Sequence, residues 1–524
     1  MNVSATKATR TRLSKVARTP KGRLSFSWWR AARISSQGFF LLIFVYLFLS
    51  TTVNVSSPLP VDLFLRLDPL LGIGASLATR EATPNLIWTV PLMGGTLLLG
   101  RFFCGWVCPL GTTLDLARLR RSEGLAKATD ESLRRGKYLV LVVLLLAAAL
   151  GNLTLLAFDP LSLFTRTWAA LVFPALDHAF AGAVDLALAL GVPLTTMLDL
   201  ISLVRGTILP INPGYYAFAP VLLLVFSVVV GVNAVAHRFW CRYLCPLAAL
   251  LAFLGRWSLF RRQAEACIGC RRCLEGCRMG AIEGKGGETA AGECVLCLQC
   301  LETCPQRAVS FGRRGKSIGY DPSRRQLLLA TGIGVAGLAT MAVSPANASA
   351  NPYLIRPPGA DASDFLSRCA RCGQCVKVCP SGGLQPALFE AGLAGLWSPI
   401  LVPRLGPCEY PCNVCGQVCP TAAIPLLELA QKQQIKLGTA YIDRSRCIPW
   451  ADNIPCNVCQ EVCQVPTKAI KGDVVLVKDA SGEQIELMRP VVLRQDCIGC
   501  GVCEHNCPLP GPAAIRVMTE HKVI

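Results

Sequence analysis

The sequence is poor in charged side chains and has almost no histidine. Asp, Glu, Lys and Arg make up 16% of its 524 residues, whereas 52% are hydrophobic. Because an ordinary soluble domain is about one quarter charged, this composition predicts membrane segments. Haem held inside a membrane needs axial ligands, often histidine, within the spans. No haem is expected, since the four histidines lie outside the long apolar runs: His178, His237, His505 and His521.

Acidic residues are scarcer than basic ones, and the imbalance is uneven along the chain. Lys and Arg number 52 against 33 Asp and Glu, which gives a net charge of +19. Residues 351–524 hold 16 basic and 15 acidic side chains, whereas residues 1–36 hold nine basic and no acidic ones. A nucleic-acid-binding protein gathers its basic residues on one face of a domain. Cytoplasmic loops of a membrane protein explain the charge more simply, so no nucleic-acid partner is expected.

Apolar runs predict a multi-pass α-helical membrane module. Four runs are each roughly long enough to cross about 30 Å of hydrocarbon, and they lie at 38–55, 84–101, 137–157 and 216–236. The segments with 32 basic and 11 acidic residues are 1–36, 101–137 and 237–325. Those with four basic and seven acidic residues are 56–83 and 157–215. The first set is therefore expected in the cytoplasm and the second outside it, across the inner membrane of a bacterium.

The stretch 161–205 is apolar but interrupted. Its interruptions are Arg166, Pro174, Asp177, Asp185 and Pro193. These residues favour helices that lie on the outer surface of the membrane. A re-entrant pair of helices is the alternative and leaves the later sidedness unchanged.

A twin-arginine export signal is predicted in the middle of the chain. Arg324 and Arg325 precede an apolar run that ends at Val343, and small residues follow at 346–350. An ordinary fifth span is the alternative, and either one places residues 351–524 in the periplasm. We expect 327–343 to stay as a span, although 346–350 offers a cleavage site.

Cysteine is the residue type in excess, with 28 copies gathered in tight runs. Six runs follow or vary the pattern C-x2-C-x2-C-x3-C: Cys267, Cys270, Cys273 and Cys277; Cys294, Cys297, Cys300 and Cys304; Cys369, Cys372, Cys375 and Cys379; Cys408, Cys412, Cys415 and Cys419; Cys447, Cys456, Cys459 and Cys463; Cys497, Cys500, Cys503 and Cys507. In this pattern three thiolates bind one [4Fe–4S] cluster and the fourth binds the neighbouring one. Zinc sites normally use two C-x2-C pairs instead, so six clusters are predicted.

The pairing of the runs can be predicted only for the first two. One cluster is expected on Cys267, Cys270, Cys273 and Cys304, and the other on Cys294, Cys297, Cys300 and Cys277. Spacing alone leaves the pairing of the last four runs open. A small residue and an aliphatic one follow several runs, which predicts a short strand at Ala281-Ile282, Ala308-Val309, Ala423-Ile424 and Ala469-Ile470.

Four cysteines remain, in two Cys-x3-Cys-Pro motifs. Cys104 and Cys108 form one pair, and Cys241 and Cys245 form the other. Because each pair is spaced i, i+4, both thiols are expected on one helix face. The two pairs could meet in one four-thiolate metal site, which would be a seventh iron–sulfur centre. Two reducible dithiols, or purely structural cysteines, are the alternatives.

These features predict a multi-domain fold, with an α-helical membrane module and α+β ferredoxin-like [4Fe–4S] modules. The expected parts are a basic cytoplasmic segment 1–36, a membrane module 37–260, a cytoplasmic two-cluster module 261–315, a signal or span 323–350, a linker 351–366 and a periplasmic four-cluster module 367–524.

On these motifs the chain resembles two families joined end to end. Residues 1–310, with both Cys-x3-Cys-Pro pairs and a paired ferredoxin module, are similar to the membrane iron–sulfur subunits NapH and MauN. Residues 323–524, with the twin-arginine signal and four cluster runs, are similar to the exported ferredoxin-type subunits NapG and MauM. The resemblance implies a quinol dehydrogenase component that serves periplasmic nitrate reductase, with relatives beside methylamine dehydrogenase.

The expected function is therefore electron transfer from quinol to a periplasmic redox protein or reductase, with membrane lipid and the quinone pool as further partners. No site for a terminal substrate is evident, and no catalytic residue can be named. Asp177 and His178 could take up quinol protons, although such a pair is more often without a role. The alternative function is electron supply for the maturation of a periplasmic metalloenzyme of the methylamine dehydrogenase type.

Overall fold

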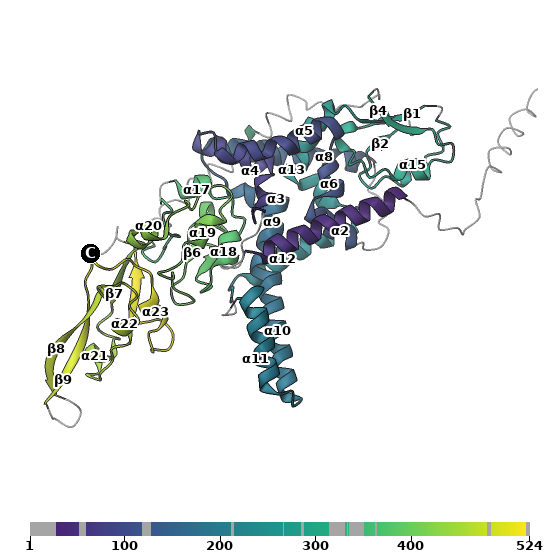
Figure 1. Ribbon diagram of the computed structural model, residues 1–524. Coiled ribbons are helices and arrows are strands. Elements are labelled where there is room, and N and C mark those ends of the chain that lie inside the picture. Colours follow the sequence, from purple (N-terminus) through teal and green to yellow (C-terminus); the bar gives the residue numbers. More distant parts are fainter. Residues whose placement is uncertain are drawn as a thin grey trace, which may run out of the picture.

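The computed structural model shows a helical body with a cysteine-rich module at each end (Figure 1). It describes residues 28–51, 59–117, 127–210, 214–265, 267–284, 288–313, 328, 331–332, 334, 351–361, 364–478 and 484–519. The predicted export signal lies almost entirely outside these residues. We call 261–313 the first cysteine module and 351–519 the second.

The helical body is built from twelve α-helices within the described residues. They are α2 (Trp28–Leu49), α3 (Leu63–Arg66), α4 (Pro69–Thr79), α5 (Val90–Leu99), α6 (Phe102–Trp106), α7 (Pro109–Leu116), α8 (Lys127–Ala149), α9 (Pro160–Thr167), α10 (Phe173–Ala189), α11 (Leu194–Thr207), α12 (Ala219–Gly231) and α13 (Pro246–Leu254). Two π-helical segments interrupt the α-helical pattern, Trp168–Val172 and Trp240–Leu244. The body's core joins residues from most of these helices, such as Phe48, Leu70, Leu163 and Leu247.

The helices differ from the predicted spans. The runs at 84–101 and 216–236 were expected to form span-length helices, but each helix is shorter than its run. A 3₁₀ segment, Pro84–Thr89, leads into the ten-residue α5, and the thirteen-residue α12 continues into another, Val232–Ala234. Pro91 and Pro220 stand in the first turns of these helices, where proline is tolerated. Gly100, with φ of 74°, ends α5. The sequence therefore overstates the length of both helices, because hydropathy does not register backbone breaks.

Two helical runs within the described residues are long and apolar enough to cross a membrane, Trp28–Leu49 and Pro160–Ala189. The second falls in the stretch that was expected to form separate surface helices. There α10 and α11 project from the body as a hairpin (Figure 1). Two of the interrupting charges are buried: Arg166 donates to the Arg371 carbonyl, and Asp177 lies 3.3 Å from Arg205. Asp185 is exposed. Pro174 stands in the first turn of α10, so it does not break the helix.

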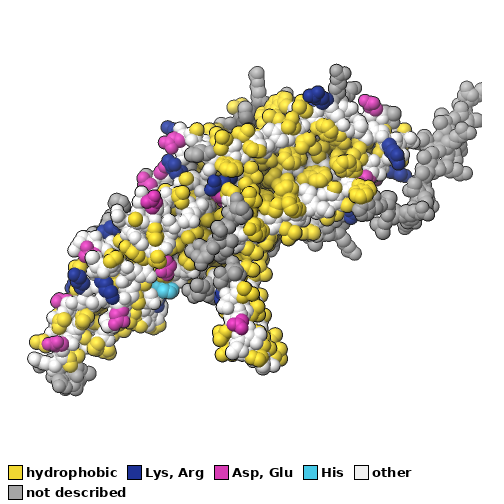
Figure 2. Space-filling view, viewed as in Figure 1, with side chains coloured by type: hydrophobic (Ala, Val, Ile, Leu, Met, Phe, Trp, Pro, Cys, Tyr) yellow, Lys and Arg dark blue, Asp and Glu magenta, His cyan; other side chains and the backbone are white. Residues whose placement is uncertain are grey.

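Hydrophobic side chains dominate the visible face of the helical body and its hairpin (Figure 2). In the same view Lys, Arg, Asp and Glu gather on the second cysteine module and at the opposite end of the molecule. Such a band of apolar surface between charged ends is the pattern expected of a chain that contacts lipid.

The first cysteine module is a small α+β unit. Strand β1 (Arg261–Ala264) pairs antiparallel with β4 (Val309–Gly312), and β2 (Ile282–Glu283) pairs with β3 (Glu288–Thr289). Helices α14 (Arg272–Glu275) and α15 (Gln299–Thr303) each carry cysteines of one run. The strands predicted after the first two runs are therefore present.

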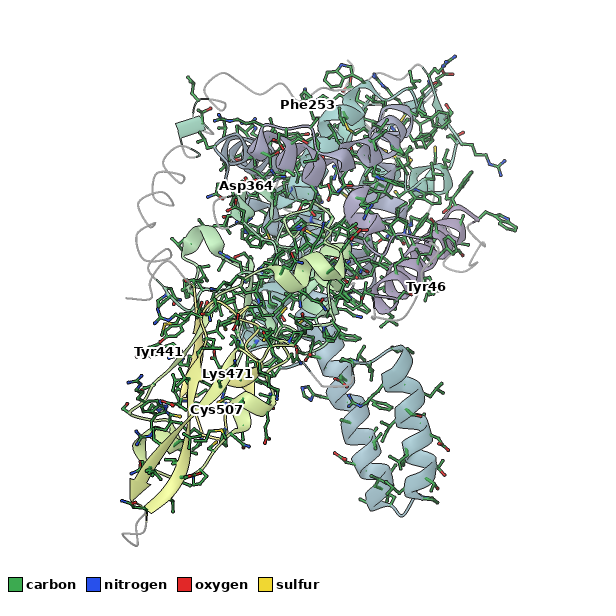
Figure 3. The ribbon with its side chains drawn as sticks, turned by 60° about the vertical axis from the view of Figure 1, so that its left-hand side comes forward. Tyr46, Phe253, Asp364, Tyr441, Lys471 and Cys507 are labelled. Atoms are coloured by element: carbon green, nitrogen blue, oxygen red, sulfur yellow. The ribbon has the colours of Figure 1, made fainter. Side chains whose placement is uncertain are left out.

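The second cysteine module repeats this plan twice. Its first half contains α17 (Phe365–Arg368), α18 (Gln374–Val378), α19 (Val414–Gln417), α20 (Leu429–Gln434) and the pair β5 (Leu384–Pro386) with β6 (Pro399–Leu401). Its second half contains α21 (Ile448–Ala451), α22 (Val458–Glu461), α23 (Val502–His505) and the pairs β7 (Thr439–Ile442) with β10 (Ile515–Met518) and β8 (Ile470–Lys478) with β9 (Gln484–Val492). A strand follows Ala469 as predicted, but none forms at Ala423-Ile424, where the chain turns. Lys471 and Cys507 mark this second half in Figure 3.

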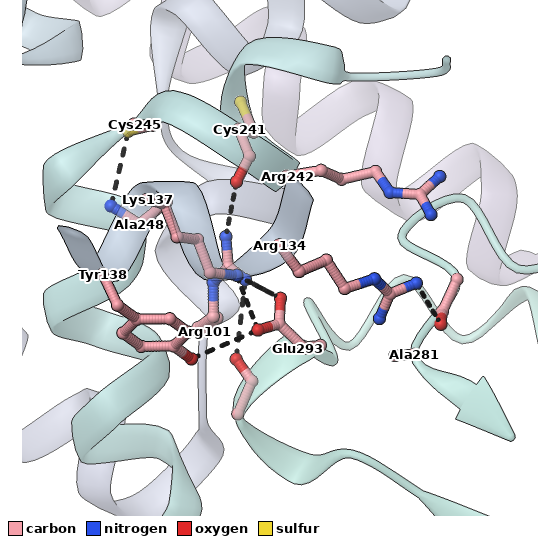
Figure 4. Close-up of polar contacts among 12 residues, drawn as sticks. Arg101, Arg134, Lys137, Tyr138, Cys241, Arg242, Cys245, Ala248, Ala281 and Glu293 are labelled. Carbon is pink, nitrogen blue, oxygen red and sulfur yellow. Dashed lines mark hydrogen bonds and ion pairs between the residues drawn. The ribbon is translucent and has the colours of Figure 1, made fainter. Parts of the chain in front are cut away.

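A buried ion cluster joins the helical body to the first cysteine module (Figure 4). Glu293 accepts hydrogen bonds from Arg101 at 2.9 Å and from Lys137 at 2.5 Å, and the side chains of both donors are fully buried. Tyr138 donates to the same carboxylate at 3.2 Å. Burial alone would raise the pKa of Glu293, but Lys137 and Arg101 lower it to about 2. The carboxylate therefore stays ionised and neutralises cations from two helical segments.

Replacing Glu293 with Gln should strongly destabilise the protein, because it leaves Arg101 and Lys137 buried without a counter-charge. Breaking a buried ion pair in this way costs about 3–5 kcal/mol. The measurement is thermal unfolding of the detergent-solubilised full chain. Glu288→Gln is the matched control, since Glu288 is exposed five residues earlier. Equal melting temperatures for the two variants would contradict this account of the interface.

Candidate metal centres

The thiols of the first cysteine module gather in two sets of four, each around its own cavity. Quartet 1 comprises Cys267, Cys270, Cys273 and Cys304, which line one cavity. Quartet 2 comprises Cys277, Cys294, Cys297 and Cys300, which line another. The fourth cysteine of each run thus crosses to the other run's set. This is the grouping that the spacing predicted, and ligation of clusters by these thiols stays a prediction.

The second cysteine module contains four further sets, whose pairing the sequence had left open. Quartet 4 comprises Cys369, Cys372, Cys375 and Cys419, and quartet 5 comprises Cys379, Cys408, Cys412 and Cys415. Quartet 6 comprises Cys463, Cys497, Cys500 and Cys503, and quartet 7 comprises Cys447, Cys456, Cys459 and Cys507. The third run therefore exchanges its fourth cysteine with the fourth run, and the fifth run with the sixth.

The remaining cysteines meet as quartet 3 in the core of the helical body. Cys108 lies within electrostatic reach of Cys104 and Cys241, and Cys245 within reach of Cys241 and Cys104. All four thiols are buried. The two Cys-x3-Cys-Pro motifs, 133 residues or more apart in the chain, are thus brought to one place.

The expectation that each i, i+4 pair shares one helix face is wrong. Cys104 lies in α6, whereas Cys108 caps the start of α7. Cys241 lies in the π-helical segment Trp240–Leu244, and Cys245 caps the start of α13. The proline after each second cysteine begins a new helix, because it cannot continue the preceding one. Each capping sulfur then accepts a backbone N–H, from Gly111 at 3.5 Å and from Ala248 at 3.3 Å.

Two buried arginines hold the backbone of quartet 3. Arg238 donates to the Cys104 carbonyl at 2.6 Å, and Arg101 donates to the Cys241 carbonyl at 3.3 Å. Asp115 neutralises Arg238 at 2.7 Å, and Glu293 neutralises Arg101. Cations beside a thiolate site favour its charged, ligand-competent form. The arrangement therefore suits a four-thiolate centre whose negative charge is balanced from both sides.

The chemistry of the donor sets fits cubane clusters. The cavities of quartets 1, 2, 5 and 7 are each lined by four cysteines together with apolar or small residues, such as Ile282, Leu384 and Ile515. Burial raises the pKa of Cys415 and Cys503, and the neighbouring thiols raise it further. Thiols in such a place become thiolates only when a metal centre binds them. In the described residues no group of three or more His, Cys, Asp or Glu side chains is placed so that it could bind one single metal ion.

Quartets 2 and 3 are direct neighbours. Gly105 lies between Cys104 and Cys108, and a Cβ atom there would stand 2.4 Å from the Val295 carbonyl oxygen. Only glycine permits this approach of the two backbones. Trp106 also donates to the Leu296 carbonyl at 3.0 Å. The first cysteine module is therefore seated on the Cys-x3-Cys-Pro motif itself.

One short helix connects quartet 3 with quartet 4. Asp159, at the start of α9, lies within electrostatic reach of Cys245. Arg166, near the end of α9, donates to the carbonyl of Arg371 at 3.0 Å, between Cys369 and Cys372. Since α9 has eight residues, it spans about 12 Å at 1.5 Å per residue. Residues at the two ends of α9 therefore reach quartet 3 and the loop of quartet 4.

The second cysteine module continues the series. Quartets 4 and 5 share the exchanged cysteines of their runs, as quartets 6 and 7 do. The Cys408 N–H of quartet 5 donates to the Cys500 carbonyl of quartet 6 at 2.8 Å. The seven quartets therefore follow one another from quartet 1, in the first module, to quartet 7, at the far end of the second.

Arginines without carboxylate partners surround quartet 4. Arg371 donates to the carbonyls of Cys369, Leu396 and Ala394, and Arg166 stacks 4.1 Å above the Trp397 ring. Both guanidinium groups are buried, and neither has a carboxylate partner within the described residues. Their electrostatic partners are the thiols of Cys369 and Cys372. The sequence marked Arg166 only as an interruption of an apolar stretch and did not point to Arg371, because local pattern does not show which residues distant in the chain these arginines contact.

Comparison with known proteins places these features in a family. A family model described as "4Fe-4S binding domain" matches residues 81–125 and 218–264, around the two Cys-x3-Cys-Pro motifs. MauM, a methylamine utilization ferredoxin-type protein of Methylorubrum extorquens, is 36% identical over 206 residues, which are 38% of this chain and 89% of MauM. The ferredoxin-type protein NapG of Escherichia coli is 33% identical over 195 residues, or 36% of this chain and 80% of NapG.

A weaker likeness links the chain to a second kind of protein. MauN, a methylamine utilization ferredoxin-type protein of Methylobacillus flagellatus, is 26% identical over 232 residues, which are 43% of this chain and 65% of MauN. No solved structure matches the chain.

Together the thiol quartets and these matches define an iron–sulfur electron-transfer protein of the ferredoxin type. More narrowly, the chain belongs to the family of MauM and NapG. The matches to MauM and NapG cover little more than a third of this chain.

Replacing Arg166 with Gln should lower the reduction potential of the centre at quartet 4. Removing one buried positive charge at a distance of several ångströms corresponds to on the order of 50–100 mV for a one-electron centre. Arg166→Lys keeps the charge and should retain most of the wild-type potential. Redox titration monitored by electron paramagnetic resonance measures the shift. Arg444→Gln, at an exposed site distant from quartet 4, is the control, and equal potentials in all variants would refute the electrostatic role.

Proposed function

We propose that this chain is a membrane-anchored conduit that carries electrons from quinol in a bacterial inner membrane to a redox partner in the periplasm. The observation that carries the proposal is the uninterrupted series of seven thiol quartets, with quartet 3 in the helical body between the two cysteine modules. Seven sets of four use all 28 cysteines of the sequence. Quartets 1, 2 and 4–7 would hold [4Fe–4S] clusters, and quartet 3 a seventh iron–sulfur centre.

The protein supplies the spacing and the electrostatics of the conduit. When bound, the clusters supply one-electron carriers with thiolate ligands. The chain holds quartets 2 and 3 together through Gly105 and Trp106, and quartets 3 and 4 through α9. Buried arginines at quartets 3 and 4 stabilise the negative charge that each site acquires. A hydrocarbon layer of about 30 Å would separate sites on its two sides, and quartet 3 divides that distance.

The likeness to MauN and the two matches to a 4Fe-4S binding domain support a fused architecture, with a part similar to NapH or MauN before a part similar to NapG or MauM. Two helices with the length and composition of spans, Trp28–Leu49 and Pro160–Ala189, support membrane attachment. Of the predicted fifth span the structure describes four residues, and one of them, Gly334, lies against Val143 and Leu146 of α8. That contact favours retention of the span over cleavage.

The names of the relatives favour two kinds of acceptor. NapG-like function would direct the electrons toward a periplasmic nitrate reductase. A second candidate is electron supply for the maturation of a periplasmic metalloenzyme, which the likeness to the methylamine utilization proteins MauM, up to 36% identical, and MauN, 26% identical, supports. The two candidates share the same conduit and differ only in the partner at quartet 7. Co-purification with a reductase subunit or with a cofactor-free enzyme precursor would separate them.

Quinol should reduce the iron–sulfur centres of the full chain in native membranes. Anaerobic membranes with wild-type protein are mixed with a quinol, and the bleaching of cluster absorbance is followed. Cys241→Ser, which removes one thiol of quartet 3, should leave one group of centres slow to equilibrate with the other, because the series is interrupted. Reduction by dithionite but not by quinol would contradict quinol as the donor. Unchanged, single-phase reduction in Cys241→Ser would contradict the place of quartet 3 in the route.

A further inference from the structure

One lysine lies buried where the second cysteine module meets the helical body. Lys377 of α18 is 7% exposed. Its Nζ atom lies 4.5 Å from the ring centre of Phe173 and 5.4 Å from that of Phe48. Lys377 stands two residues after Cys375 of quartet 4. An ammonium group is therefore held between aromatic rings beside the first centre of the second module.

Within the described residues these two rings are the recorded partners of the ammonium group. A comparison with Lys432, which is 4% exposed, is instructive. Lys432 donates to the backbone carbonyls of Glu409 and Tyr410. A buried ammonium group without such acceptors is unfavourable. Lys377 therefore presents hydrogen-bond donors that a ligand can use.

The surroundings of Lys377 are aromatic. Phe48 packs edge-on against Phe173 and against Trp168, with ring centres 5.9 Å apart in both pairs. Phe44 continues the wall, 6.0 Å from Trp168. Trp168 begins the π-helical segment that precedes α10. Single π-helical turns inside α-helices are frequent at functional sites, because they widen the helix locally.

Two further polar groups lie beside these aromatic rings. The Oε1 atom of Gln374 is buried and has no hydrogen-bond partner in the described structure. Gln374 precedes Lys377 by three residues, which puts both on the same side of α18. Asp177 follows Phe173 by one helical turn, is 1% exposed, and has Arg205 at 3.3 Å as its ion partner. A donor, an acceptor and a carboxylate thus stand near a set of aromatic rings.

We propose that Lys377, Gln374, Phe48 and Phe173 form the binding site for the head group of a quinol. This inference rests on the proposed function and names its site. A quinol ring is flat and stacks on aromatic faces, and its two oxygens need one donor and one acceptor in turn. The prenyl tail would follow the exposed apolar side chains of α2 and α10, among them Leu42 and Leu176, which are 70% and 51% exposed.

The position also suits the redox step. Quinol loses two electrons and two protons and becomes quinone. The electrons would pass one at a time to an iron–sulfur cluster held by the thiols of quartet 4, and Lys377 lies on the helix that carries Cys375 of this quartet. The two protons leave in turn through Asp177, the buried carboxylate one turn beyond Phe173, toward water near the exposed His178. Lys377 donates a hydrogen bond to the quinol oxygen and stabilises the negative charge that develops there as protons leave.

The test compares Lys377→Met with wild type as full-length protein in native membranes. The apparent KM for quinol should rise about 10- to 100-fold, as expected for loss of a charge-assisted hydrogen bond. Reduction by dithionite and the iron content should not change. Lys377→Arg keeps the donors and should recover much of the affinity. Lys471→Met, at an exposed position of the same module, is the matched control.

The outcomes separate this site from the function on which it rests. If quinol fails to reduce wild type, the proposed function falls. If quinol reduces wild type and Lys377→Met with equal KM, the site is wrong and the function stands. A second measurement applies even if the variant fails to fold: a photoreactive quinone should label wild type within 44–48, 168–177 or 374–377. Labelling elsewhere, or competition by phospholipid but not by quinone, would overturn the inference.

Discussion

The contact between Arg166 and the loop that carries Cys369 and Cys372 is the interaction on which the arrangement depends. It brings a buried cation from the helical body to the loop between Cys369 and Cys372. Gly373, with φ of 80°, makes room for this contact, since a Cβ atom there would stand 3.2 Å from the Cα atom of Arg166. In the opposite direction, Arg371 of the second cysteine module donates a hydrogen bond to Thr154 of the helical body at 3.2 Å. Two buried cations side by side are unfavourable unless an anion faces them. A cluster with four thiolate ligands is such an anion, so filling quartet 4 and seating the module on the body should stabilise each other.

Buried arginines also lie beside quartet 3, but there carboxylates neutralise them. Arg238 and Arg101 are balanced by Asp115 and Glu293, and all four groups lie between the Cys-x3-Cys-Pro motifs and the first cysteine module. The two centres nearest the middle of the series therefore differ in their surroundings. Within the described residues, the buried cations Arg166 and Arg371 face quartet 4 together with one carboxylate, Asp62, which lies within electrostatic reach of Cys372. The excess of positive charge favours its reduced state, whereas the charges around quartet 3 largely cancel. A centre at quartet 4 should therefore have a higher reduction potential than one at quartet 3, which favours electron transfer toward the second cysteine module.

The sequence predicted those features of the fold and of the thiol quartets that depend on residues close together in the chain. The spacing of Cys267 through Cys304 predicts the crossed grouping of quartets 1 and 2, because neighbouring runs fold on each other. Local pattern could not pair the later runs, since insertions change the gap before Cys412 and Cys456. Hydropathy found the apolar runs but not the 3₁₀ segments at Pro84–Thr89 and Val232–Ala234, which shorten the α-helices within them. Helical periodicity misplaced Cys108 and Cys245, because the following prolines restart the helix. The roles of Lys377 and Arg166 depend on contacts with residues that are distant in sequence, so local pattern could not predict them.

The most direct test of a continuous seven-centre series is to locate the iron in the anaerobically purified full chain. A cryo-electron microscopy map, with iron and acid-labile sulfide measured on the same sample, gives both position and number. Seven cubanes predict about 28 iron atoms per chain, with a strong density peak among Cys104, Cys108, Cys241 and Cys245 between those of quartets 2 and 4. An empty or zinc-filled quartet 3, with about 24 iron atoms in the six remaining clusters, would contradict the account.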